Sequence, residues 1–197
     1  MPATEKKIVD RIRESIALKE KILSDRKLIA AIGKAAEAAY KALSKGKKII
    51  FFGNGGSASD AQHLVAELVV RFRRERKALS AMALPANSAL LTAMSNDYSF
   101  DRIFSRQIEA LGASGDVAFA ISTSGVSKNI IDGMKAASAK KMTVVGLLGK
   151  GGGQALKHTD IALLIPGTDT ARIQESQITV GHIICEIIEE RIAGAGK

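Results

Sequence analysis

Five short apolar runs, separated by stretches with helical spacing, are the feature that most constrains the fold of this chain. The runs are continuous, as in strands buried on both faces of a sheet, and they cover residues 48–52, 81–84, 117–121, 143–148 and 161–165. Helical patterns lie between them at about 57–72, 100–111 and 127–141, with a short turn after Gly152 and a last helix at about 172–192. This alternation predicts an α/β fold, in which right-handed crossovers build a central parallel five-stranded sheet with helices on both faces.

Two helical patterns precede the first predicted strand, at about residues 5–23 and 25–43. The second pattern is rich in alanine and ends at Gly46 among lysines, which is a good helix stop. We therefore expect N-terminal helices at 1–46 and a domain at 47–197, joined in one structural unit. The first helix is amphipathic and has no strand of its own to cover, so we expect its apolar side to contact another copy of the chain.

Length and composition favour one folded domain. The chain has 197 residues, of which 46% are hydrophobic and 25% charged, which supplies a core and excludes extensive disorder. Its single cysteine, Cys185, excludes a disulfide framework, and we interpret it as a small buried hydrophobe. Residues 1–10 lack the apolar segment of a secretory signal, and no apolar run reaches membrane-spanning length. We expect a cytoplasmic protein with no membrane partner.

The net charge of +9 indicates an anionic partner. Basic residues cluster at 45–48, 71–77 and 140–141, and we interpret these clusters as solvated ends of helices and strands. A nucleic-acid partner is not expected, because no helix gathers the basic charge. Aromatic residues are also only 4% of the chain, which leaves few surfaces on which bases can stack.

Two loops rich in glycine and serine follow predicted strands and lead directly into helices. The first is Gly-Asn-Gly-Gly-Ser at 53–57, and the second, at 122–127, offers the hydroxyls of Ser122, Thr123, Ser124 and Ser127. A loop at the carboxyl end of a strand that opens a helix presents free backbone N–H groups to an anion, so we expect phosphate binding. A tight turn would explain the first loop alone, but the four hydroxyls of the second exceed what a helix cap needs. Neither loop has the spacing of a P-loop or a dinucleotide fingerprint.

Histidines in two helical patterns suggest a metal site. His63 and Glu67 are four residues apart and share a helix face, a spacing that can chelate a metal but more often marks a surface pair. On the last predicted helix, Gln174 and His182 point about 80° apart, and His182 lies among isoleucines that we expect to be buried, so it needs a polar partner. His158 lies in a polar stretch and is expected at the surface.

Several motifs in order resemble the sugar isomerase (SIS) domain family, and within it the phosphoheptose isomerases. They span essentially the whole chain: 53–57, 60–63 with Glu67, Asn96 with Asp97, 104–107, 122–125, and 172–175 with His182. Asn96 and Asp97 would by themselves indicate only a turn in a loop after Met94. In some members an aspartate stands three residues before the glutamine, where this chain has Ala171, whereas Asp169 stands five before it as in other members.

The resemblance implies a single SIS-type domain and an isomerase that converts D-sedoheptulose 7-phosphate into D-glycero-D-manno-heptose 7-phosphate through an enediolate. It places the reaction in bacterial heptose and surface-polysaccharide biosynthesis. It also implies a homotetramer with active sites between subunits, and one zinc ion per subunit held by His63, Glu67, Gln174 and His182. The implied substrate contacts are Asn54, Gly55, Gly56, Ser57, Glu67, Asn96, Asp97, Ser122, Thr123, Ser124, Ser127 and Gln174, with Ser57 and Arg71 close to the set that contacts the sugar.

The required chemistry agrees with the residues. Aldose–ketose isomerisation needs a base that takes a proton from the carbon beside the carbonyl and an acid that moves a proton between oxygens. The ordinary pKa of a glutamate is about 4.3 and that of a histidine about 6.5, so near neutral pH we expect Glu67 to act as the base and His182 as the acid.

Three alternatives stay open. A non-catalytic relative of this fold that binds a replication-initiator protein would be a scaffold, although a scaffold has no physical need for four metal-binding and catalytic side chains. A sugar-phosphate-sensing transcription regulator would need a DNA-binding module, and the N-terminal helices are too few and insufficiently basic for one. An isomerase of another phosphosugar is the third, because phosphate-binding serines do not report the length of the sugar.

Overall fold

The computed structural model describes residues 2–194, so that Met1 and the last three residues of the expected 47–197 region lie outside the described part. Five parallel strands form a sheet in the order β2-β1-β3-β4-β5. The strands are β1 (Ile49–Gly53), β2 (Ala81–Ala83), β3 (Val117–Ser122), β4 (Thr143–Leu148) and β5 (Ile161–Leu164). The predicted parallel five-stranded sheet is confirmed.

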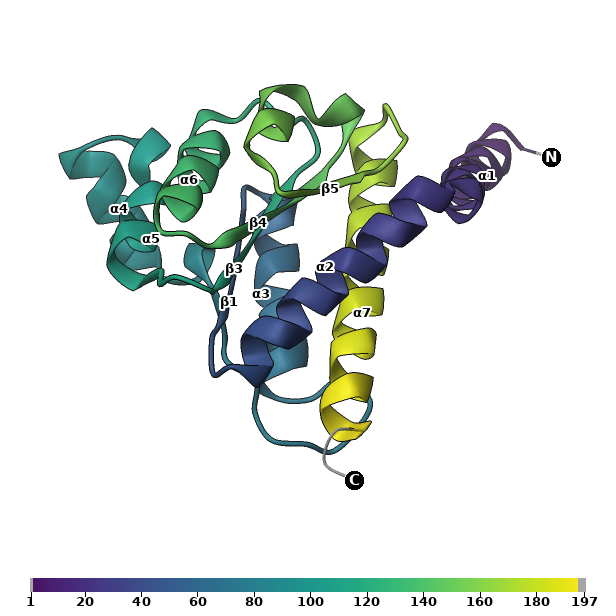
Figure 1. Cartoon of the computed structure of the whole chain (residues 1–197). Coiled ribbons are helices and arrows are strands. Elements are labelled where there is room, and N and C mark those ends of the chain that lie inside the picture. The colour runs from purple at the N-terminus through teal and green to yellow at the C-terminus, as the bar shows by residue number, and fades with distance from the viewer. Residues whose placement is uncertain (1, 195–197) are drawn as a thin grey trace.

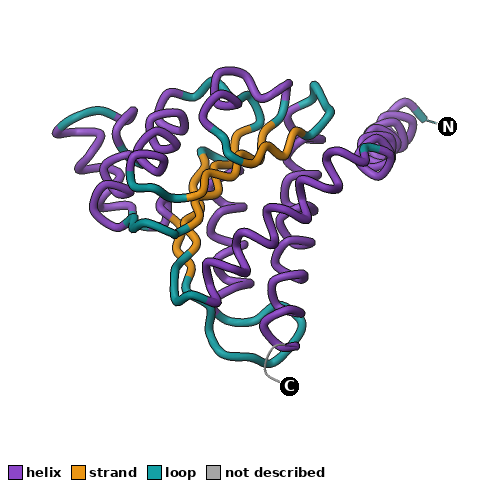
Figure 2. The backbone as a smooth tube through the Cα atoms, in the orientation of Figure 1, coloured by secondary structure: helices purple, strands orange, loops and turns teal. Residues whose placement is uncertain are grey.

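Helices lie on both sides of this sheet (Figure 1 and Figure 2). They are α1 (Ala3–Ser24), α2 (Arg26–Ser44), α3 (Gly56–Val69), α4 (Ser88–Asp97), α5 (Ser105–Leu111), α6 (Lys128–Ala139) and α7 (Thr170–Gly194). Short 3-10 segments occur at Leu84–Ala86, Phe100–Arg102 and Lys150–His158. Among residues 2–194, no helix combines the length and the apolar character needed to cross a membrane.

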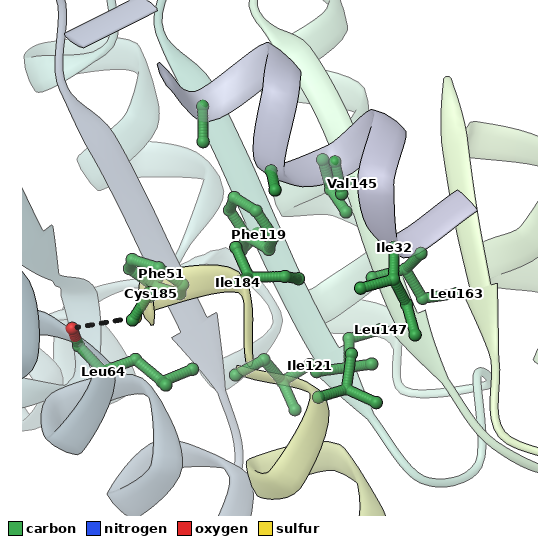
Figure 3. Packing of buried hydrophobic residues seen from close by; sticks show 14 of the residues in the cluster. Ile32, Phe51, Leu64, Phe119, Ile121, Val145, Leu147, Leu163, Ile184 and Cys185 are labelled. Atoms are coloured by element: carbon green, nitrogen blue, oxygen red, sulfur yellow. Dashed lines mark hydrogen bonds between the residues drawn. The ribbon is translucent and has the colours of Figure 1, made fainter. Parts of the chain in front are cut away.

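Apart from Ser122 at the end of β3 and Thr143 at the start of β4, the strands carry no polar side chains, because each face of the sheet has its own core. Alternate residues such as Phe51, Phe119 and Val145 pack against α2, α3 and α7, and Phe51 stacks on Phe119 with 4.9 Å between ring centroids (Figure 3). The intervening residues, such as Phe52 and Val144, pack against α4, α5 and α6. Burial of both faces explains why the sequence shows continuous rather than alternating apolar runs.

The two N-terminal helices differ in burial. Asp25 separates them and caps α2, because its carboxylate accepts hydrogen bonds from the backbone N–H groups of Lys27 and Leu28, both at 3.0 Å. Helix α2 contributes much of its apolar side to the core. Helix α1 lies at the outer edge of the molecule (Figure 1), and Ile8, Ile12 and Ile16 are 55%, 55% and 52% exposed. The apolar side of α1 is thus left open along its first four turns.

Helix α4 was not predicted, and Asn96 and Asp97, which we expected in a loop after Met94, form its last turn. Asn87 caps this helix by accepting a hydrogen bond from the N–H of Leu90 at 3.0 Å, and the helix continues to Asp97. The expected helix at 100–111 is likewise divided into a 3-10 turn and α5. Few side chains of α4 are buried, so the segment lacks a strong apolar periodicity in the sequence.

The interpretation of the basic clusters as solvated ends is wrong for Arg76. Its side chain is only 3% exposed and lies beside Glu189 of α7. The cause is charge pairing between segments far apart in the sequence, which composition does not reveal. His158, expected at the surface, is half-buried at the end of its 3-10 segment.

Candidate active site and metal centre

The two glycine- and serine-rich loops meet at the carboxyl edge of neighbouring strands. After β1 the chain crosses to β2, and after β3 it crosses to β4 on the other side, so the β1 and β3 ends flank the point where strand order reverses. Ligands of open parallel sheets bind in the crevice at such a point. Gly55, with a φ of 54°, is the N-cap residue of α3, and Ser127 is the N-cap residue of α6. The Ser127 side chain does not cap α6, although the N–H of Ile130 in its first turn donates to Asn129 Oδ1 at 2.9 Å. Two helix N-termini therefore offer backbone N–H groups to an anion.

Asn54 is held by a residue that sequence reasoning missed. Its amide forms a reciprocal pair with that of Asn129: Asn54 Nδ2 donates to Asn129 Oδ1 at 2.9 Å, and Asn129 Nδ2 donates to Asn54 Oδ1 at 2.8 Å. Asn129 is buried in the first turn of α6. The pair joins the first loop to the start of α6, just after the second loop. The only sign of it in the sequence is a polar residue, Asn129, near the start of the helix predicted at 127–141.

Internal contacts shape the serine loop. Ser122 is buried, and its hydroxyl accepts a hydrogen bond from the N–H of Gly125 at 3.0 Å, while Thr123, Ser124 and Ser127 are half-buried. The hydroxyl of Ser124 likewise accepts a hydrogen bond from the N–H of Val126 at 3.4 Å, whereas the hydroxyl of Ser127 does not cap α6. In the first loop, Gly55 and Gly56 are exposed and Ser57 is buried.

Three of the four predicted metal ligands, His63, Glu67 and His182, lie together in the structure. His63 Nε2 lies 2.9 Å from Glu67 Oε1 and 3.2 Å from His182 Nε2, and the ligand atoms of the three residues lie within 4.8 Å of one another. Helices α3 and α7 pack together to bring these residues into one place, although 119 positions separate the two histidines. Two imidazole nitrogens and a carboxylate oxygen that converge in this way suit a divalent cation.

The environment of the cluster lowers the basicity of one histidine. Burial, followed by the charge of His63, holds the pKa of His182 below its ordinary value, while Glu67 opposes the change. His182 is therefore mainly neutral near pH 7, as a metal ligand or proton relay must be. On the same helix as His63, burial raises the pKa of Asp60 to about 6, against the charge of His63.

Phe72 covers the other side of His182. Their rings stack with 5.5 Å between centroids and 11° between planes. Phe72 follows the exposed Arg71, in the segment after α3, and sequence reasoning did not single it out. The expectation that the isoleucines beside His182 are buried is wrong for Ile183, which is 42% exposed. The His182 ring instead lies against the rings of Phe72 and of His63 from α3.

Gln174 and Asp169 lie near the start of α7. The side-chain amide of Gln174 lies so close to Gly56 that a methyl group there would overlap it. Gln174 therefore contacts the first loop, about two helical turns before His182. Asp169 caps α7: its Oδ1 accepts a hydrogen bond from the N–H of Arg172 at 3.0 Å, a contact that holds the pKa of Asp169 below its ordinary value.

Asn96 and Asp97 are at the end of α4, where the sequence predicted a turn in a loop. Both are exposed, and Asn96 Nδ2 donates to Asp97 Oδ1 at 2.9 Å. Within residues 2–194, neither side chain forms a hydrogen bond with any predicted site residue outside this pair. Cys185 is buried beside Leu64 (Figure 3), which raises the pKa of its thiol to about 12 and confirms that it packs as a hydrophobe.

Comparison with known proteins decides the family. Residues 12–149, more than half of the chain, match the SIS domain family. The phosphoheptose isomerase of Clostridium acetobutylicum is 47% identical over 184 residues, which cover 93% of this chain and 94% of the relative. The chain belongs to the phosphoheptose isomerase family.

Solved phosphoheptose isomerase structures have the same fold. That of Neisseria gonorrhoeae has a TM-score of 0.90 and 39% identity, covering 95% of this chain and 100% of the other. That of Francisella tularensis has a TM-score of 0.92 and 35% identity, covering 96% of this chain and 100% of the other. The family, the single SIS-type domain and the isomerase class predicted from the sequence are confirmed, whereas the roles of individual site residues stay predictions.

Proposed function

We propose that this member of the phosphoheptose isomerase family converts D-sedoheptulose 7-phosphate into D-glycero-D-manno-heptose 7-phosphate, in bacterial heptose biosynthesis for surface polysaccharides. The observation that supports this most is the cluster of His63, Glu67 and His182 in a chain 47% identical to a phosphoheptose isomerase. The family relation supplies the substrate class, and the cluster supplies the groups that the reaction needs.

The phosphate group is bound by the serine loop in this proposal. The hydroxyls of Thr123, Ser124 and Ser127 and the free N–H groups at the start of α6 are the donors that recognise it. Asn54, Gly55, Gly56 and Ser57 then contact the sugar from the first loop, whose position the Asn129 pair maintains. Asn96 and Asp97 are further proposed sugar contacts.

A zinc ion suits the cluster. Zinc binds imidazole nitrogen and carboxylate oxygen, and a catalytic site leaves a position open for substrate, so His63, Glu67 and His182 fit it as protein ligands, with the Gln174 amide proposed as the fourth. When bound, zinc would polarise the substrate carbonyl and stabilise negative charge on the adjacent oxygens.

Glu67 and His182 carry out the proton transfers. Glu67 takes a proton from C1 of the ketose while O2 receives one through His182, which gives the enediol. His182 then accepts the proton of O1, and Glu67 returns its proton to C2, which gives the aldose. One hydrogen has moved from C1 to C2 and one from O1 to O2, so the reaction balances. In this scheme one ring nitrogen of His182 is a metal ligand, so the other ring nitrogen gives the proton to O2 and later accepts the proton of O1.

A cytoplasmic homotetramer is also proposed, with active sites between subunits and with helices 1–46 forming contacts to other copies. The open apolar side of α1 supports this, because isolated amphipathic helices need a partner surface. An apolar groove between α1, α2 and α7, lined by Ile22, Leu23, Ile29 and Ile183, extends that surface.

The test follows the formation of the aldoheptose phosphate from sedoheptulose 7-phosphate by nuclear magnetic resonance, using purified protein after chelation and again after zinc is restored. Turnover that disappears with chelation and returns with zinc would support both the reaction and the metal. A folded, zinc-loaded protein that binds the phosphosugar without turnover would contradict the proposal. That result would favour another sugar phosphate or the scaffold alternative.

A further inference from the structure

Glu189 of α7 is a buried carboxylate that takes no part in the proton transfers described above. It is 1% exposed and lies about two turns beyond His182 on the same helix. Its Oε1 accepts a hydrogen bond from the N–H of Phe72 at 2.9 Å, and its Oε2 accepts from Arg73 at 2.8 Å and Arg74 at 3.0 Å. Burying a charge is costly unless it is paired. The Glu189 carboxylate therefore favours the backbone position in which the segment after α3 donates these three hydrogen bonds.

Arg76 connects the same carboxylate to the end of α3. Its Nε lies 3.4 Å from Glu189 Oε1, and one of its terminal nitrogens donates to the backbone carbonyl of Glu67 at 2.7 Å. The other terminal nitrogen donates to the carbonyl of Val70 at 3.3 Å. The last carbonyls of a helix lack partners within the helix, so the guanidinium of Arg76 caps the helix that carries His63 and Glu67.

The segment 72–76 thus contacts two residues of the proposed metal site, His182 and Glu67. At one end, the Phe72 ring stacks on the His182 ring. At the other end, Arg76 binds the backbone of Glu67. One carboxylate holds both ends of the segment. Burial alone would raise the pKa of Glu189, but the three N–H groups and Arg76 hold it below its ordinary value, so the carboxylate is charged near pH 7.

We propose that Glu189 is a positioning residue for the His63, Glu67 and His182 cluster, acting through Phe72 and Arg76. It sets the orientation of the His182 ring and the end of the helix that carries Glu67. The kinetic part of this inference rests on the proposed function, whereas the metal-binding part does not. Outer contacts that orient metal ligands typically change metal affinity or activity by about 10- to 100-fold when they are removed.

The test compares Glu189→Gln with Glu190→Gln. Glu190 is the next residue of α7 and pairs with Arg74 at 3.1 Å, but its side chain is 52% exposed, so the second variant is a matched control. Zinc affinity is measured by competition with a chelator, together with kcat and KM for sedoheptulose 7-phosphate and helical content by circular dichroism. We expect Glu189→Gln to bind zinc at least about 10-fold more weakly and to lower kcat, with KM within about twofold, while Glu190→Gln matches the unaltered chain.

Folded Glu189→Gln protein with unaltered zinc affinity and kcat would overturn the proposal. If this variant does not fold, Arg76→Lys decides: the lysine keeps the charge beside Glu189 but cannot also bind the Glu67 and Val70 carbonyls. Weakened zinc binding by Arg76→Lys would support the proposal, and unaltered zinc binding would overturn it. Failure of the unaltered chain to bind zinc would also overturn the proposal about Glu189. Zinc binding without isomerisation of sedoheptulose 7-phosphate would contradict only the proposed substrate and leave the role of Glu189 in metal binding intact.

Discussion

At the residue scale, Gly125 shows how tightly the serine loop is packed. Its φ of 66° lies in the left-handed region, and a methyl group at this position would overlap the carbonyl of Gly152. The Gly125 carbonyl also accepts a hydrogen bond from the N–H of Ala155 at 2.9 Å. The proposed phosphate-binding loop therefore depends on the glycines of the 150–158 segment as much as on its own serines.

Gly125→Ala is expected to weaken phosphosugar binding. Alanine at this φ costs about 1–2 kcal/mol of backbone strain. Its methyl group would also overlap the Gly152 carbonyl, so the loop must move. We predict a KM raised by about 10-fold or more, measured by initial rates. Gly46→Ala is the control, because Gly46 has a φ of 70° but open space around it. That variant should lose only the stability that the backbone strain costs, with KM unchanged. An unchanged KM in both variants would contradict the prediction.

The side chains that sequence reasoning missed share one property: their partners are remote in the chain. Asn129 pairs with Asn54 across 75 positions, and Glu189 binds the backbone at Phe72 across 117. Spacing within one helix predicted that His63 and Glu67 share a face, because helix geometry is local. The meeting of His63 with His182 depends on how α3 packs against α7, which the motifs suggested only through the family resemblance.

At the element scale, Asp116 links the start of β1 to the start of β3. Its carboxylate accepts hydrogen bonds from the backbone N–H of Lys48 at 3.0 Å and of Ala113 at 2.9 Å, and lies 2.7 Å from Lys48 Nζ. Burial opposes ionisation, but the contacts with Lys48 and Ala113 hold the pKa of Asp116 below its ordinary value. A carboxylate with a lowered pKa stabilises the fold above its unfolded pKa and loses that contribution as the pH falls toward the folded value.

Asp116→Asn is expected to destabilise the protein by about 1–3 kcal/mol at pH 7, because buried N–H groups lose a charged acceptor. Urea unfolding followed by circular dichroism measures the loss. The difference from the unaltered chain should shrink once the pH falls below about 4, where the unfolded carboxyl becomes protonated. A difference that stays constant from pH 7 to pH 3 would show that Asp116 contributes no charge-dependent stability.

Helix α1 tests the oligomer proposal. Ile12 is 55% exposed in the middle of its apolar side, and a charge there opposes burial against another copy. We predict that Ile12→Glu lowers the mass measured by light scattering below that of a tetramer, with helical content retained. Arg13→Glu changes charge on the neighbouring, 76% exposed side chain and should leave the mass unchanged. A tetramer that survives Ile12→Glu would exclude this side of α1 as a subunit contact.

At the scale of the whole molecule, the sequence predicted the sheet more fully than the helices around it. Strands buried on both faces leave continuous apolar runs, and all five were found. Helix α4 was missed, because it buries little beyond Met94 and so leaves no clear periodicity. Strand order β2-β1-β3-β4-β5 then explains the site, since it brings the two predicted loops to the point where ligands bind.

The most direct test of the account is the turnover of sedoheptulose 7-phosphate by Glu67→Gln protein whose zinc content has been verified. The glutamine keeps the shape and an oxygen ligand of the side chain but cannot accept a proton as a carboxylate does. We expect this substitution to lower kcat by about 10²- to 10⁴-fold, the usual contribution of a general base, while calorimetry shows that the phosphosugar still binds. Turnover at the unaltered rate would show that Glu67 is not the base and would contradict the assignment of this cluster as the active site.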